Sequence, residues 1–254
     1  REIAPLAVTS ADGEVAFVEG RDFEPVPGAS SSMEFYIPAG VTKEIKLTPK
    51  SRIKAGEKVL LSFFYSTLIY SDQAVCSTQD PGILAIMEDQ MRRVAEAWPS
   101  QGYFMNYDEI RIGGWEEQPA GENLTPGQML ARHVKTGIGY IKKYAPGARV
   151  YVWSDMFDPS HNARPFETRK MYYYLVNGNW DGAWEGLGSD VIICNWNGTE
   201  RAAESLKWFA GRGHKQFIAG YYDGEPKENI GTWMKASEGV PNIIGMMYTT
   251  WRGD

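Results

Sequence analysis

The sequence has few cysteines and histidines and no long apolar run, and each shortage removes a class of protein. Two cysteines, Cys76 and Cys194, are too few for a disulfide framework. The histidines His133, His161 and His214 lie far apart and lack the spacing of metal ligands. No apolar stretch approaches the roughly 18 residues of a transmembrane helix. We therefore expect no metal, no other cofactor and no membrane partner.

Excess positive charge and glycine-rich phosphate loops are also missing. The formal net charge is −6, which argues against nucleic acid and anionic membranes as partners. No glycine-rich loop follows a strand-like run, so a nucleotide-binding fold has little support. The chain begins at Arg1 without a methionine, which predicts a processed or trimmed N-terminus. Its localisation stays open, with a secreted or periplasmic location favoured.

Two regions of different character follow one another along the sequence. Residues 1–55 carry short alternating patterns at 14–18, 33–37 and 43–47, separated by turns rich in Gly, Pro and Ser. They predict a small β-rich appendage or insertion. Residues 56–254 alternate apolar runs of strand length with helical patterns, and we predict that they form the catalytic region.

The second region predicts parallel strands joined by helices. Strands are expected at 59–65, 102–109, 149–155, 190–196, 216–223 and 243–251. Helices are expected at 81–98, 126–144, 165–177, 200–211 and 227–238. Thr125 and Pro126 are residue types preferred at the N-cap and at the first position of a helix. Continuous apolar strands joined by helices are typical of a parallel sheet covered on its outside.

Most of these strands run into polar or aromatic clusters at their carboxyl ends. The clusters are 108–109, 153–155, 195–197, 221–223 and 251–254. A doubly wound sheet is decorated in this way only near its switch point, whereas a (β/α) barrel builds its site from all strand ends. The sequence therefore predicts an α/β fold of the (β/α)8 TIM-barrel type. Because a full barrel needs eight strands, we expect a partial barrel that begins near the third strand.

The adjacent carboxylates Asp108 and Glu109 are the most informative feature of the chain. Burying both charges is costly. A chain keeps such a pair mainly where one carboxyl must hold a proton while the other stays ionised, as glycosidic bond cleavage requires. The alternative is a polar junction where both acids are solvated. Adjacent strand side chains point to opposite faces, so both reach one pocket only if the strand ends and the backbone turns. Abundant aromatic residues favour sugar stacking, and Trp180 and Trp184 either form such a platform or pack their loop.

With these strand ends laid out, the chain resembles the barrels of glycoside hydrolase family 20, the β-N-acetylhexosaminidases. An Asp-Glu pair ends the fourth strand in that family, so 59–65 becomes the third strand and the resemblance covers about residues 58–254. The family's His-x-Gly-Gly-Asp-Glu motif stands here as Phe104-Met-Asn-Tyr-Asp-Glu109, without the histidine and both glycines. Asp254 stands where the family more often has Glu.

The resemblance implies a role for each matching residue. Glu109 would act as general acid/base, and Asp108 would orient the substrate 2-acetamido group and stabilise an oxazolinium intermediate. The implied substrate-binding residues are Trp153, Trp196, Tyr222, Asp223, Trp251 and Asp254. The implied activity is that of a hexosaminidase-like hydrolase in carbohydrate metabolism or polysaccharide degradation, which cleaves a β-linked glycan with retention of configuration.

Two further charged groups have two interpretations each. Asp155, a further substrate-binding candidate, and Asp158 could hold a divalent metal or act as hydrogen-bonding loop residues, and the loop role is favoured. Arg111, also a substrate-binding candidate, could clamp a substrate carboxylate or pair with Asp108, and the pair is favoured.

Two other functions stay open. If Asp108 is structural, Glu225 or Asp223 could be the nucleophile of a retaining hexosidase in which Glu109 is the acid/base. The second open function is carbohydrate binding without catalysis, because an open barrel loses loops from one side of its site. The expected partner is a carbohydrate. A homo-oligomer or a complementing chain would close the barrel and cover its free sheet edges.

Overall fold

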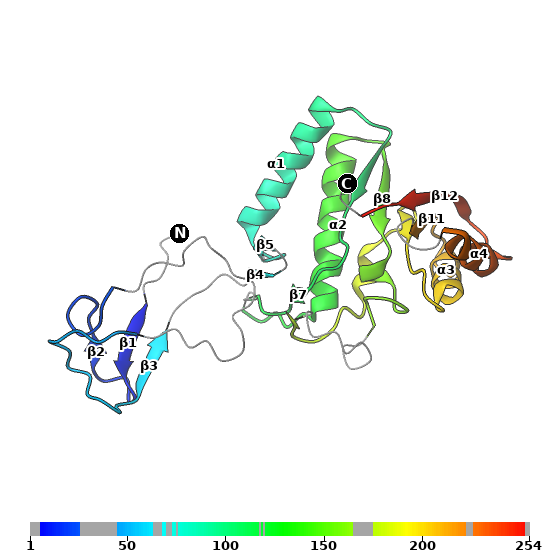
Figure 1. Ribbon diagram of the computed structural model, residues 1–254. Helices are drawn as coiled ribbons and strands as arrows, with labels where there is room; N and C mark the ends of the chain where they lie inside the picture. The colour runs from blue at the N-terminus through cyan, green and yellow to red at the C-terminus, as the bar shows by residue number, and fades with distance from the viewer. Residues whose placement is uncertain are drawn as a thin grey trace. The chain divides into compact units, whose positions relative to one another are not determined.

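The computed structural model describes residues 6–25, 45–62, 68–69, 73–74, 76–116, 118, 120–164, 175–221 and 226–251 (Figure 1). The strand predicted at 33–37 lies outside them. The chain divides into two compact units, Arg1–Val75 and Cys76–Asp254.

The first unit contains a three-stranded antiparallel sheet. Its central strand β1 (Ala7–Ser10) pairs with β2 (Ala16–Phe17) on one side and with β3 (Val59–Ser62) on the other. The prediction that 59–65 is the third barrel strand is therefore wrong for the described residues of β3. The reason is that the backbone of β1 supplies the hydrogen-bond partners of this run, which the apolar pattern alone does not identify.

An ion pair with a buried carboxylate anchors the loops of the first unit. This unit also contains the antiparallel pair of β4 (Leu68–Ile69) and β5 (Gln73–Ala74). The fully buried carboxylate of Asp22 accepts hydrogen bonds from the backbone N–H of Val18 at 2.8 Å and from the Arg52 guanidinium at 2.7 Å. The contact with Arg52 holds the pKa of the Asp22 carboxyl well below its usual range. The charge of Asp22 is thus compensated inside the unit.

The second unit is built on a five-stranded parallel sheet. Its strands are β6 (Gly102–Met105), β8 (Arg149–Trp153), β10 (Ile192–Asn195), β11 (Gln216–Tyr221) and β12 (Ile243–Thr249). Each strand pairs in parallel with the one that precedes it in this series. The order across the sheet is therefore the order along the chain, and the predicted α/β class is confirmed.

The helices of this unit agree with the predicted ranges to within two residues. They are α1 (Pro81–Ala97), α2 (Pro126–Tyr144), α3 (Ala202–Gly211) and α4 (Pro226–Ser237). Figure 1 shows α1 beside α2 and α3 beside α4, and both pairs are in contact. Parallel strands in this order are connected by right-handed crossovers, which place α2, α3 and α4 on one face of the sheet.

Helix α2 has start and stop signals in its own sequence. The Thr125 hydroxyl accepts the backbone N–H of Gln128, and the Gln128 side chain accepts the N–H of Thr125, which is a capping box. Pro126 follows at the first helical position, where its missing N–H leaves no hydrogen bond unmade. Lys142 and Lys143 lie in the last turn, at the negative end of the helix dipole. Local chemistry therefore determines both ends of α2.

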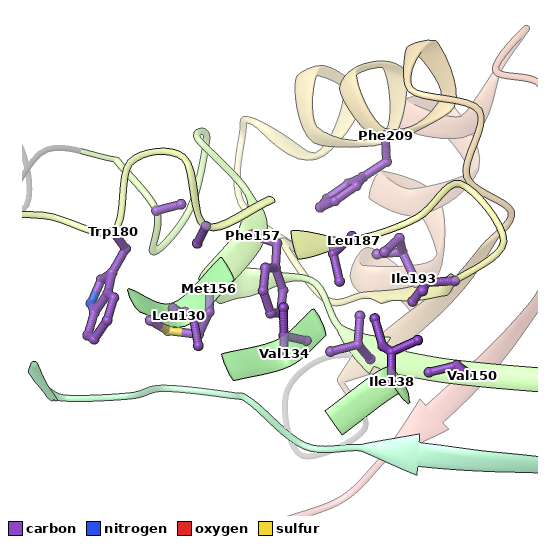
Figure 2. Close-up of a cluster of buried hydrophobic side chains, with 14 of the residues drawn as sticks. Leu130, Val134, Ile138, Val150, Met156, Phe157, Trp180, Leu187, Ile193 and Phe209 are labelled. Atoms are coloured by element: carbon purple, nitrogen blue, oxygen red, sulfur yellow. The ribbon is translucent and has the colours of Figure 1, made fainter. Parts of the chain in front are cut away.

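The main core lies between α2 and the helix-covered face of the sheet (Figure 2). Leu130, Val134 and Ile138 of α2 belong to one buried cluster with Val150 of β8 and Ile193 of β10. Burial of each such side chain contributes about 1.5–3 kcal/mol. This packing holds the strands in place and so positions the loops that follow them.

Aromatic rings line the opposite face of the sheet, because strand side chains alternate between faces. The ring centroid of Phe104 lies 4.8 Å from that of Trp153 and 6.5 Å from that of Tyr151. Tyr151 in turn lies 6.3 Å from Phe217. The row of rings spans β6, β8 and β11 and reaches the carboxyl end of β8 at Trp153.

The connection between β8 and β10 differs from the prediction. Its described part contains two 3-10 helices, η1 (Asp155–Phe157) and η3 (Ala183–Gly186), and strand β9 (Leu175–Val176). Most of the helix predicted at 165–177 lies outside the described residues. Its end is wrong, because Leu175–Val176 pairs in parallel with β7 (Ile112–Gly113), whose backbone supplies the hydrogen-bond partners.

Candidate active site

A cavity of about 450 Å³ opens at the carboxyl ends of the parallel strands. The strand ends contribute Asp108 and Glu109 after β6, Trp153 of β8, Trp196 after β10, Tyr221 of β11, and Thr249 and Trp251 at the end of β12. Loops and α4 add His161, Gly198, Thr199 and Asn229. A cavity of this size that combines aromatic walls with a few polar groups is typical of a small-molecule site.

A turn in the backbone brings both acids to the cavity. Strand β6 ends at Met105, and the left-handed φ values of Tyr107 (56°) and Glu109 (45°) follow on either side of Asp108. Residues other than glycine reach this region at a cost of about 1–3 kcal/mol each, so the surrounding structure must hold them there. The turn breaks the alternation of a strand, and both Asp108 and Glu109 line the same cavity.

Side chains from other segments hold this turn. The Glu109 N–H donates to Asp155 Oδ2 at 2.8 Å. The Tyr107 hydroxyl lies 3.0 Å from His133 Nδ1 on α2. Burial raises the pKa of the Tyr107 phenol and lowers the pKa of His133, so both side chains are neutral at pH 7. The Tyr107 ring also meets Phe157 edge to face at 6.2 Å. The turn is therefore tied to α2 and to the loop after β8.

The favoured pairing of Arg111 with Asp108 was wrong, because Arg111 pairs with the neighbouring acid Glu109. One of its guanidinium nitrogens lies 2.7 Å from Glu109 Oε2. The Arg111 side chain is only 10% exposed while the Glu109 carboxylate is 37% exposed, so the ion pair lies at the boundary between protein and cavity. The contact orients the Glu109 carboxylate from one side.

Three tryptophans form walls of the cavity, at the positions that the strand ends predicted. Trp153 and Trp251 lie 6.3 Å apart, and Trp251 is 65% exposed, so its ring is accessible at the rim. The Trp196 ring packs edge to face against His161 at 4.4 Å. Such rings stack on the faces of sugars. The sequence assigned no role to His161, because this histidine lacks the spacing of a metal ligand and belongs to no other motif.

Asp155 and Asp158 lie behind the cavity wall and are fully buried. Burial raises the pKa of Asp155 to about 7, although three hydrogen-bond donors act to lower it. Burial also raises the pKa of Asp158. Asp158 accepts hydrogen bonds from Ser205 and from Asn197. The favoured interpretation as hydrogen-bonding loop acids agrees with these contacts. In the described ranges, no group of three or more His, Cys, Asp or Glu side chains is arranged to hold a metal ion.

The remaining candidates divide into two groups. Tyr222, Asp223, Glu225 and Asp254 lie outside the described residues. Trp180 is 4% exposed within the core cluster, and the Trp184 ring packs edge to face on Trp208 at 5.2 Å. Of the two interpretations for Trp180 and Trp184, the structure shows packing of the loop. Asn229, Thr199 and Thr249 line the cavity without having been predicted, because no motif marks them.

Comparisons with family models and with curated protein sequences find no significant match to this chain. Over the residues that the structure describes, no helix has both the length and the apolar character needed to cross a bilayer. The function is therefore inferred from the residues around the cavity.

Proposed function

We propose that this chain is a glycoside hydrolase of β-linked glycans, with the cavity at the strand ends as its active site. The single observation that carries the proposal is that two adjacent carboxylates, Asp108 and Glu109, line one cavity with three tryptophans. Paired carboxyls are the chemical requirement of glycoside hydrolysis, and aromatic walls suit the apolar faces of sugar rings.

For the fold we propose a partial (β/α)8 barrel. Strand order that follows the chain supports a barrel, because doubly wound sheets reverse their order at a switch point. Since β3 belongs to the antiparallel sheet of the first unit, the parallel strands would correspond to the fourth to eighth barrel strands. The chain would then be related to family 20 through its Asp-Glu pair and its strand-end tryptophans.

The proposed mechanism is substrate-assisted and retaining. The carbonyl oxygen of the substrate 2-acetamido group attacks the anomeric carbon while Glu109 donates a proton to the departing glycosidic oxygen. Asp108 orients the acetamido group and stabilises the positive charge of the oxazolinium that forms. Glu109 then removes a proton from water, the water oxygen bonds to the anomeric carbon, and the ring opens to the acetamido sugar. The second inversion restores the original configuration.

A carbohydrate-binding function without catalysis is the second candidate. The ion pair between Arg111 and Glu109 favours it, because the proposed acid is already engaged by a cation of the protein itself. The exposed rings of Trp251 and Tyr221 would serve sugar binding equally well. A plain hexosidase with Asp223 or Glu225 as nucleophile requires residues outside the described ranges.

The test is hydrolysis of a panel of aryl β-glycosides that includes the N-acetylglucosaminide. Glu109→Gln should lower kcat by about 10²–10⁴-fold, the usual contribution of a general acid/base. Glu122→Gln is the matched control, since it also replaces a glutamate that is paired with an arginine, Arg132, but at the surface. If the wild type hydrolyses no member of the panel, the hydrolase proposal fails, and calorimetric titration with N-acetylglucosamine then decides on the binding function.

A further inference from the structure

One buried carboxylate joins three segments around the cavity. Asp155 Oδ2 accepts the backbone N–H of Glu109 at 2.8 Å and the side-chain amide of Asn162 at 2.7 Å. Its Oδ1 accepts the indole N–H of Trp196 at 3.1 Å. Asp155 itself is fully buried and is not among the residues that line the cavity. It therefore contacts the loop of the general acid and a tryptophan wall at the same time.

The three hydrogen bonds to Asp155 need an acceptor at both ends of its side chain. A carboxylate accepts at each of its oxygens, whereas the amide of asparagine accepts at one end and donates at the other. In an Asp155→Asn variant an NH2 group in place of Oδ2 would leave Glu109 and Asn162 without their acceptor, and one in place of Oδ1 would leave Trp196 without its acceptor. A buried donor without a partner is destabilising, because its hydrogen bond to water has been given up without replacement. The three hydrogen bonds thus require the two acceptor oxygens of a carboxylate, and a side chain of the same size is not enough.

The contact with Glu109 falls on a residue with an unfavourable backbone conformation. The φ angle of Glu109 is 45°, which residues other than glycine rarely adopt. Rotation about this angle moves the side chain relative to the N–H that Asp155 holds. Loss of the acceptor allows the backbone to relax toward negative φ and moves the Glu109 carboxylate away from its place in the cavity.

We propose that Asp155 is a positioning residue, which holds the Glu109 backbone and the Trp196 ring in a constant arrangement so that the acid meets the glycosidic oxygen of a sugar stacked on the tryptophan. This inference rests on the proposed hydrolase function for its effect on rate. The geometric part, that Asp155 holds the Glu109 backbone, stands on its own. Burial raises the pKa of Asp155 to about 7, and the nearby charge of Asp108 adds to this effect.

Asp158 provides a matched control three residues along the chain. It is equally buried, and it also accepts three hydrogen bonds, from Ser205 Oγ at 2.6 Å, from Asn197 Nδ2 at 3.1 Å and from the Ser160 N–H at 2.7 Å. None of these donors belongs to the turn that carries Glu109. Asp158→Asn therefore makes the same chemical change in the same kind of environment.

The experiment compares Asp155→Asn and Asp158→Asn by kcat and KM on 4-nitrophenyl N-acetyl-β-D-glucosaminide, and by melting temperature. Asp155→Asn should lower kcat by about 10–10²-fold, the cost of a misplacement near 1 Å, with little change in KM. Asp158→Asn should lower the melting temperature by a similar amount and keep kcat near that of the wild type. Wild-type kcat in Asp155→Asn, or equal kcat losses in both variants, would overturn the proposal.

A second measurement does not depend on turnover. Amide hydrogen exchange of the segment 106–112, followed by mass spectrometry, should be faster in Asp155→Asn than in the wild type and unchanged in Asp158→Asn. If the wild type cleaves no glycoside, the hydrolase proposal fails while exchange still decides whether Asp155 holds the Glu109 backbone. Unchanged exchange in both Asp155→Asn and Asp155→Ala, the second of which removes both acceptor oxygens, overturns the inference.

A milder variant covers the case in which Asp155→Asn does not fold. Asn162→Ala removes one of the two donors to Asp155 Oδ2 and leaves the carboxylate in place. It should raise exchange in 106–112 and lower kcat by a smaller factor than Asp155→Asn. The proposal is contradicted if Asp155→Asn does not fold and Asn162→Ala has the exchange rate and kcat of the wild type. Asp155 would then serve stability alone.

Discussion

Asp108 and Glu109 are neighbours in the chain with different surroundings, and different surroundings give two carboxyls different chemical roles. Glu109 contacts Arg111 through its side chain and Asp155 through its backbone N–H. Asp108 lies between two residues with left-handed φ and lines the cavity from the same turn. Their contacts differ in this way, and the proposed division assigns the proton donor to Glu109 and the orienting anion to Asp108.

Asp108→Asn separates the substrate-assisted mechanism from a plain hexosidase. If Asp108 orients the acetamido group, the variant should lose about 10²-fold or more in kcat on the aryl N-acetylglucosaminide, because a stabilising contact to developing charge is lost. Neither the wild type nor the variant should hydrolyse an aryl glucoside, because that substrate lacks the acetamido nucleophile. Initial rates on both substrates provide the measurement, with Asp190→Asn, a surface acid paired with Lys142, as control. Wild-type hydrolysis of the aryl glucoside, or an unchanged rate of the variant on the N-acetylglucosaminide, would contradict the orienting role.

The two cysteines should differ sharply in reactivity. Cys194 is 2% exposed in β10, and burial raises the pKa of its thiol to about 12, whereas Cys76 is exposed. A thiol reagent should therefore label Cys76 in the native protein and Cys194 only after denaturation, because the thiolate is the reactive form. Mass spectrometry of labelled peptides measures this. Native labelling of a Cys76→Ser variant at Cys194 would show that β10 is accessible.

At the scale of single residues, the sequence indicated several side chains that line the cavity, but not the backbone conformation that brings them there. Trp153, Trp196 and Trp251 were found because they follow strand patterns. The left-handed φ of Tyr107 and of Glu109 could not be predicted, because no glycine marks the turn. Such a conformation persists only through contacts from distant parts of the chain, which a local pattern does not contain.

At the scale of elements, α2 has its start signal in a few consecutive residues. Thr125→Ala removes the N-cap hydroxyl that accepts the Gln128 N–H, and should lower the free energy of unfolding by about 1 kcal/mol. Thr136→Ala is the matched control on the same helix, since the half-buried Thr136 hydroxyl donates back to the Arg132 carbonyl oxygen within the helix and caps no helix end. Urea unfolding followed by circular dichroism measures both. A larger loss in Thr136→Ala would contradict the capping role.

Helices and strands differed in how far the sequence could place them. The caps and apolar spacing that define α2 lie within the helix, so its ends were predicted to the residue. The apolar run of β3 indicated a strand correctly, but the pattern does not reveal which edge the strand will join. Its pairing with β1 joins residues far apart in the sequence, and register and partner depend on that distant strand.

At the scale of the whole molecule, each unit contains a buried carboxyl with an opposite response to pH. The pKa of Asp22 lies below its ordinary 3.8, so its contribution to stability is fully present above about pH 4 and is lost as the pH falls further. The pKa of Asp155 is raised to about 7, so its contribution is present below about pH 4 and is lost as the pH rises to 7.

We therefore expect Asp22→Asn to cost most stability at neutral pH, with the difference from the wild type shrinking below about pH 4. The stability of the wild type relative to Asp155→Asn should fall as the pH rises from 4 to 7. Amide exchange of peptides from 6–25 and from 149–157, measured between pH 3 and 7 and corrected for intrinsic rates, reports on each unit separately. Glu14→Gln, at an exposed position, should show neither trend.

The agreement between strand order and chain order has a consequence for how the second unit is made. During synthesis β6 emerges first, and each later parallel strand finds its partner already outside the ribosome. Every addition closes only the connection between consecutive strands of the sheet, so the entropy lost at each step stays small. No pairing already formed has to be broken to admit a later strand, and the sheet can grow in the direction of translation.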